Sequence, residues 1–172
     1  MKKELIERIE VGAGGASSIE FTSIPQDGKD LMILFSNRFD TGQATIQVQL
    51  NSDTGANYSK TALNTFGPSY VQSAQVIDGT SIAYVGGGRQ NFTSNTFASN
   101  EITISNYASS SSKSLSVDAV VENNSGADFK YYLSLTAGNY TTTDAVTSIK
   151  LFGSGANFVE HSTASLYKVV TE

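Results

Sequence analysis

The chain has 172 residues and a formal net charge of −5, and only 16% of its residues are charged. The absence of Cys and the presence of only one His exclude disulfide scaffolds, thiolate metal sites and multi-histidine zinc centres. No apolar run reaches the ~18 residues of a membrane-spanning helix, and an acidic chain lacks the basic surface that nucleic acids require. We therefore expect no nucleic-acid and no membrane partner. The length favours one domain.

The first predicted element lies at the N-terminus. Leu5, Ile6 and Ile9 have helical spacing, but a helix this short is marginal on its own. Leu5 and Ile9 also fit one face of a strand, and we favour the strand. Residues 1–12 are therefore interpreted as an N-terminal strand or arm, and residues 13–172 as one β-sandwich domain.

Further along the chain, apolar residues recur with a period of two. Leu133 and Leu135 continue an alternation that begins at Phe129 and Tyr131, and residues 115–121 alternate in the same way. This pattern is typical of half-buried strands in antiparallel sheets. The predicted strands lie near residues 4–11, 18–24, 30–38, 44–51, 69–77, 80–85, 100–105, 114–122, 129–136, 146–152 and 164–170.

Turn residues separate these runs. Asp27-Gly28, Asp53-Thr54-Gly55, Asp78-Gly79 and Gly86-Gly87-Gly88 each lie between apolar stretches. Many short strands with turns every 8–14 residues favour a sandwich or barrel. The predicted fold class is all-β, a single-domain antiparallel β-sandwich that is jelly-roll-like.

Charge is unevenly distributed. Residues 39–112 contain six charged residues, which are Asp40, Asp53, Lys60, Asp78, Arg89 and Glu101. Depletion of charge is typical of interface cores. The alternative is a loop-rich region that Ser, Thr and Asn keep solvated; the chain has 53 of these three residues. Both interpretations stay open at this point.

Candidate catalytic groups are sparse. His161 follows Glu160, but no G-x-S-x-G nucleophile elbow accompanies it. Asp118 and Glu122 lie on one face of a predicted strand at roughly 13 Å, farther apart than the ~5–9.5 Å of a glycosidase pair. We predict that the protein is not an enzyme and has no catalytic residue.

A metal site is also not expected. Asn51-Ser52-Asp53-Thr54-Gly55 resembles the opening of a calcium loop, but Ala62 stands where an EF-hand needs its bidentate Glu. An Asx-type turn explains the same residues without a metal. We predict no metal and no cofactor.

Five tyrosines lie in or beside predicted loops or at strand ends: Tyr58, Tyr70, Tyr84, Tyr107 and Tyr140. Aromatic faces near amide side chains suit sugar binding, and the same residues suit a protein interface. The sequence does not separate these two interpretations.

Several segments resemble small β-structured virion proteins of tailed bacteriophages. They run in order over nearly the whole chain, at residues 15–26, 30–31, 51–59, 95–97, 104–107, 113–118, 122–124, 145–149, 157–158 and 162–167. Two parts depart from the pattern: residues 26–29 replace a Tyr/Thr-containing turn, and residues 66–94 have no counterpart. Residues 66–94 are the candidate for the variable, location-specific part.

The resemblance implies a structural role without cofactor or catalytic residues. The expected function is a capsid decoration or cement protein, made in the host cytoplasm and located on the virion capsid surface. Its partners would be the major capsid protein and, as a homotrimer of jelly rolls, two further copies. The alternative is a tail-fibre or receptor-binding module for host-surface glycans. The predicted partner-binding residues are Leu5, Ile6, Ile9, Phe66, Tyr70, Phe92 and Phe97.

Overall fold

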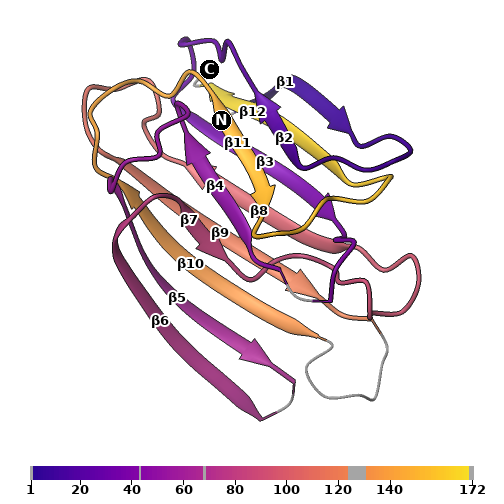
Figure 1. Ribbon diagram of the computed structural model, residues 1–172. Coiled ribbons are helices and arrows are strands. Elements are labelled where there is room, and N and C mark those ends of the chain that lie inside the picture. The colour runs from indigo at the N-terminus through magenta and orange to yellow at the C-terminus, as the bar shows by residue number, and fades with distance from the viewer. Residues whose placement is uncertain (1, 43, 68, 124–130, 171–172) are drawn as a thin grey trace.

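A computed structural model describes residues 2–42, 44–67, 69–123 and 131–170 of the chain (Figure 1). In these ranges every regular element is a strand, and all neighbouring strands pair antiparallel in two sheets. The predicted all-β antiparallel sandwich is therefore confirmed. Its jelly-roll character stays a prediction.

The larger sheet has eight strands and the smaller has four. The order across the larger sheet is β1 (Lys2–Glu10), β12 (Thr163–Val170), β3 (Asp30–Asn37), β8 (Ala98–Ile104), β9 (Lys113–Val121), β10 (Tyr132–Tyr140), β5 (Tyr58–Phe66) and β6 (Tyr70–Gly79). The order across the smaller sheet is β2 (Ser18–Phe21), β11 (Ile149–Gly153), β4 (Ile46–Leu50) and β7 (Ile82–Tyr84).

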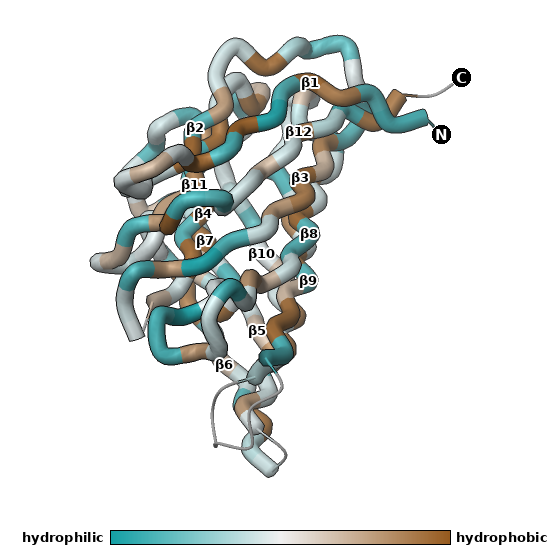
Figure 2. The backbone as a smooth tube through the Cα atoms, turned by 90° about the vertical axis from the view of Figure 1, so that its right-hand side faces the viewer, coloured by the Kyte–Doolittle hydropathy of each residue, from teal (hydrophilic) through white to brown (hydrophobic). Residues whose placement is uncertain are grey.

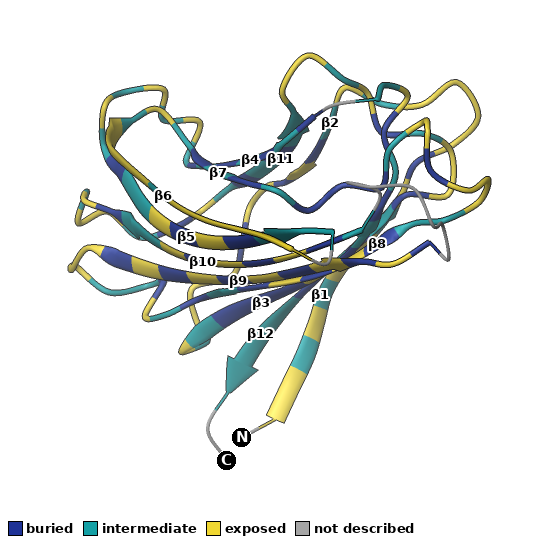
Figure 3. Cartoon of the chain, turned by 90° about the horizontal axis from the view of Figure 1, so that it is seen from below, coloured by how far each residue is buried: buried dark blue, intermediate teal, exposed yellow. Residues whose placement is uncertain are grey.

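The main core fills the space between the two sheets, where hydrophobic residues of both gather (Figure 2). Phe158 is central to it: its ring stacks on Phe39 at 5.2 Å and meets Phe35 edge-on at 5.3 Å. A second, smaller cluster contains Phe92 and Tyr132. Strands β9 and β10 alternate between buried and exposed residues along most of their lengths, as half-buried strands must (Figure 3).

Each predicted strand range overlaps one strand of the structure, with ends that shift by a few residues. The N-terminal segment is strand β1, paired with β12, and not a helix. One strand was not predicted: β5. Its inward positions carry Lys60 and Asn64, whereas Leu63 points outward. The sequence of β5 therefore lacks the alternation of apolar and polar residues by which the other strands were recognised. Residues 129–130 of the predicted 129–136 strand lie outside the described residues.

The turn after β4 is the predicted Asx turn. Asp53 Oδ1 accepts a hydrogen bond from the backbone N–H of Gly55 at 2.7 Å, and its Oδ2 accepts one from Asn57 Nδ2 at 2.8 Å. These bonds, the first above all, lower the pKa of Asp53 below its ordinary value of 3.8. The charged form of this carboxyl therefore stabilises the folded state.

The sign of the pH dependence follows from this shift. Because the folded-state pKa of Asp53 lies below the unfolded value, its contribution is present at neutral pH and is lost as the pH falls through the acid range. We expect the Asp53→Asn variant to lose less free energy of unfolding than the wild type between about pH 7 and about pH 3. Urea unfolding at both pH values measures this difference, and equal losses in the two proteins would contradict it.

Candidate interaction surface

Strand β10 places its apolar residues on the solvent side of the large sheet. In a half-buried strand the apolar residues of an alternating pattern are expected to face the core, but Leu133 and Leu135 are 57% and 53% exposed. The inward, buried positions belong to Tyr132, Ser134 and Thr136. The period of the pattern is confirmed and the predicted face is wrong, because alternation alone does not say which of two faces meets the second sheet.

Strand β5, the neighbour of β10, has the same reversed polarity. Leu63 is 51% exposed and lies directly opposite Leu135. On the inner face, Ala62 and Asn64 are buried, and Lys60 Nζ donates a hydrogen bond to the carbonyl of Ala83 on β7. In their middle parts, these two adjacent strands thus direct leucines to solvent and small or polar groups inward, and their inward tyrosines lie at the strand ends.

Together these residues form a surface that we call the outer apolar strip. It crosses the outer face of the large sheet from β3 to β6. Its members are Leu34, Phe97, Val120, Leu133, Leu135, Leu63 and Val71. Val120 lies directly opposite Leu133, and a shallow hollow of about 480 Å³ joins Val120 to Leu34 and Phe97. Contiguous exposed apolar patches of this kind mark interaction sites.

An acidic pair interrupts the strip between Leu34 of β3 and Leu135 of β10. Glu101 of β8 lies directly opposite Asp118 of β9, and both are exposed on the outer face. Like charges at directly opposed positions destabilise a sheet. Both residues line the same hollow as Leu34 and Val120. A partner with a basic group at this point would relieve the repulsion.

Two of the predicted partner-binding residues contact Tyr132, and a third contacts one of these two. The ring of Tyr132 lies 6.3 Å from that of Phe66 and 6.1 Å from that of Phe92, and Phe66 contacts Tyr70 at 5.9 Å. Only Tyr70 is exposed. Phe92 is buried in the second core cluster, with the guanidinium of Arg89 over its ring. In the free chain Phe92 therefore packs the core and does not offer a contact surface.

The other predicted partner-binding residues are spread over the large sheet. Leu5 is exposed on the outer face of β1, opposite Tyr167 of β12. Ile6 and Ile9 are partly buried and pack against the main core. Phe97 lines the hollow of the outer apolar strip. Leu5 thus lies on the same outer face as the strip, two strands away from Leu34 of β3.

The loop tyrosines are mostly core residues. Tyr58, Tyr84, Tyr107 and Tyr140 are buried, and burial is the main cause that raises the pKa of each above its ordinary value. Tyr58 stacks on Tyr140 at 4.8 Å. Of the five, only Tyr70 keeps an exposed ring, so a sugar-binding surface built on the other four does not fit this fold.

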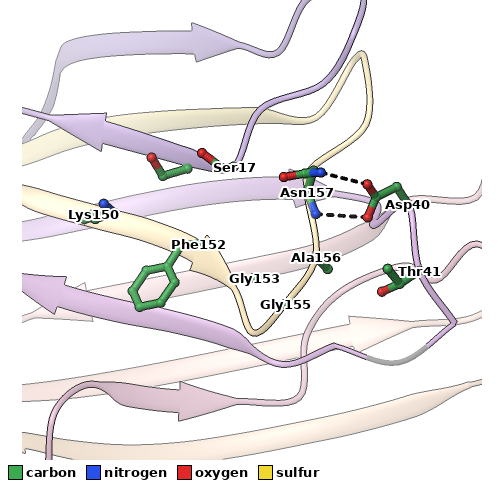
Figure 4. A pocket seen from close by; sticks show the side chains of 10 residues that line it. Ser17, Asp40, Thr41, Lys150, Phe152, Gly153, Gly155, Ala156 and Asn157 are labelled. Atoms are coloured by element: carbon green, nitrogen blue, oxygen red, sulfur yellow. Dashed lines mark hydrogen bonds between the residues drawn. The ribbon is translucent and has the colours of Figure 1, made fainter.

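The small sheet carries a separate pocket of about 410 Å³ near the end of β11 (Figure 4). Phe152 and Lys150 lie on its wall, with the ammonium 5.8 Å from the ring centre. Asp40 accepts two hydrogen bonds from Asn157, from the backbone N–H and from Nδ2, both at 2.9 Å. With both carboxylate oxygens engaged, Asp40 orders the loop and is poorly placed for acid–base chemistry.

His161 lies in a turn with a φ of 70°, and its exposed ring places Nδ1 3.3 Å from Glu10 Oε1. Within the described ranges, no three His, Asp or Glu side chains gather closely enough to hold a metal ion. The same part of the chain has no helix of the length and hydropathy that crossing a membrane requires.

Comparison of the chain with protein-family models, with curated proteins and with solved structures finds no match.

Proposed function

We propose that this chain is a structural protein of a bacteriophage virion, a capsid decoration protein that binds the capsid exterior through the outer apolar strip. The observation that carries this proposal is the reversed polarity of β10 and β5. Leu133, Leu135 and Leu63 face solvent, although the inward positions between the tyrosines at the ends of these strands hold small or polar residues. The sequence resemblance to small β-structured phage proteins supplies the partner, which is the major capsid protein.

The strip suits a surface that binds a large, flat partner. Each Å² of apolar surface removed from water contributes roughly 25 cal/mol before the costs of association. The Glu101–Asp118 pair within the strip would select a basic position on the capsid. A protein that binds only the expanded shell stabilises that shell by mass action, and copies that are joined together bind more tightly than one copy.

Co-sedimentation with expanded capsids of the parent phage, assembled without this protein, tests the proposal. We expect the wild type to pellet with the capsids and the Leu63→Lys/Leu135→Lys variant to bind at least about tenfold more weakly, a loss of about 1.4 kcal/mol or more. Both leucines are half exposed, so the melting temperature of the variant should change little.

The control is the Thr54→Lys/Ser154→Lys variant. It adds the same charge at exposed loop positions away from the strip and should bind like the wild type. Failure of the wild type to bind would overturn the decoration function. Equal binding of both variants would overturn the assignment of the strip.

One observation favours the second candidate function, recognition of host-surface glycans by a tail-fibre or receptor-binding module. The pocket on the small sheet combines the ring of Phe152 with the amide of Asn157 and the hydroxyls of Ser17 and Thr41, and aromatic and polar groups of this kind are what small-ligand sites combine. A glycan array with the wild type and Phe152→Ala tests it: a reproducible hit that the variant loses would favour this function over decoration.

A further inference from the structure

The two edges of the large sheet differ in charge. Of the nine residues of β1, six are charged: Lys2, Lys3, Glu4, Glu7, Arg8 and Glu10. Of the ten residues of β6, only Asp78 is charged. Figure 2 shows the contrast in the hydrophilic colour along much of β1, and Figure 3 shows β6 exposed along nearly its whole length.

This difference matters because an edge strand presents unpaired N–H and C=O groups. Proteins protect such edges with charged side chains, proline, bulges or very short strands. The edges of the small sheet are short, with four residues in β2 and three in β7. Strand β6 is long and has neither Lys, Arg nor Pro. A bulge relative to β5 sets Ile77 and Asp78 together opposite Ser59 near the end of β6, and it leaves the pairing of residues 70–76 regular.

We propose that β6 pairs antiparallel with β6 of a second copy of this chain, so that the two large sheets become one continuous sheet across a twofold axis. An antiparallel pair of this kind has its axis perpendicular to the sheet, so each face continues across the junction. Directly opposed residues must then point to the same face of the sheet. Because faces alternate along a strand, the numbers of two opposed residues add up to an even sum. The register centred on Ala74 places Val71 of each copy opposite Ile77 of the other.

This register gives the exposed side chains of β6 matching partners in the second copy. Val71 and Ile77 are the two most exposed large hydrophobic residues of the described chain, at 65% and 69%, and each covers the other. Ser73 lies opposite Gln75 and Gln72 opposite Val76, and Asp78, the one charged residue of β6, lies in the bulge with a φ of 55°, so no like charges meet in the ladder. A second copy supplies this neutral, matching strand by symmetry, whereas an unrelated partner would need one of its own.

The pairing also joins two functional surfaces. Val71 is the end of the outer apolar strip, so the two strips would meet at the junction on one continuous face. A contact between identical edges is isologous and closes at two copies. The proposal therefore differs from the homotrimer expected from the sequence, and the oligomeric state distinguishes them.

Sedimentation velocity at about 100 µM is the first test, a concentration well above the micromolar range in which many weak pairs dissociate. We expect a species of twice the 18.3 kDa chain mass for the wild type. Ser73→Lys/Gln75→Lys places two Lys pairs opposite each other and should be a monomer. Ser73→Lys/Gln75→Glu changes the same two positions, places Lys opposite Glu, and should restore the dimer. A monomeric wild type, a trimer, or a dimer indifferent to these charges would overturn the proposal.

A single cysteine tests the register. The chain has no Cys, so under mild oxidation Ala74→Cys should form a disulfide-linked dimer only if the two copies of residue 74 face each other at bridging distance. Ser111→Cys, in an exposed loop, is the control and should remain uncrosslinked. Equal crosslinking of the two variants would overturn the paired edge, and crosslinking of Ser73→Cys in place of Ala74→Cys would overturn the register.

Discussion

Gly87→Ala is expected to lower the free energy of unfolding by about 3 kcal/mol, at the upper end of what overpacking a core costs. A Cβ at Gly87 would lie 2.0 Å from Cε2 and 2.4 Å from Cδ2 of Phe39. Phe39 has no room to move away, because it is fully buried and stacked on Phe158. The carbonyl of Gly87 also accepts a hydrogen bond from the hydroxyl of Tyr132, so a backbone shift would disturb the second core cluster as well.

Gly12→Ala is the matched control. A Cβ at Gly12 meets nothing within 4 Å, and we expect a change within about 0.5 kcal/mol, as for ordinary surface substitutions. Urea unfolding of the two variants beside the wild type measures both values. Equal stability of the two variants would mean that Gly87 does not pack closely against the ring of Phe39.

The second large effect is expected at Arg38, just after β3. Its guanidinium donates hydrogen bonds to four backbone carbonyls, at distances of 2.9–3.2 Å, and so holds the loop between β7 and β8. The accepting residues are Gln90, Phe92, Thr93 and Thr96. Since part of this network is exposed and water replaces some of the bonds, we expect Arg38→Met to cost about 2 kcal/mol of unfolding free energy. Because Phe92 belongs to the second core cluster, a loosened loop should also expose its ring.

Two measurements check this prediction. Urea unfolding gives the free energy, and limited chymotrypsin digestion reports whether cleavage at Phe92 becomes faster than in the wild type. Arg8→Met is the control, because Arg8 is exposed and pairs with Glu10 at 3.5 Å, a contact of little energetic value. If both arginine variants behaved alike, the Arg38 network would have no structural role.

The alternation of polar and apolar residues predicted the fold class. It indicated the buried face correctly for some strands and wrongly for others. In β9 every buried position is apolar except Lys113, so the period and the face agree. In β10 the period is the same, but the inward side is filled by Ser134 and Thr136. There the second sheet comes close: a Cβ at Gly138 would meet Ile82 of β7 at 3.0 Å. Small inward residues are needed where layers approach, and this requirement is not visible in one strand.

The candidate site was predicted only in part, for the same reason. Phe97 and the charge-poor region were singled out, and Phe97 does line the outer apolar strip. The leucines that form most of the strip were missed because an exposed and a buried alternating leucine look alike in sequence. The loop tyrosines were considered as surface residues, but most of them are buried. A position near a strand end does not tell whether a ring points into the sandwich, as those of Tyr107 and Tyr140 do.

Hydroxyl-radical footprinting of the chain, free and bound to expanded capsids, tests the central claim most directly, because it reports the solvent exposure of individual side chains. We predict that oxidation of Leu63, Leu133 and Leu135 falls several-fold on binding, whereas that of Phe152 on the small sheet is unchanged. Protection of Phe152 with undiminished oxidation of the three leucines would contradict the claim that the outer apolar strip is the surface that meets the capsid.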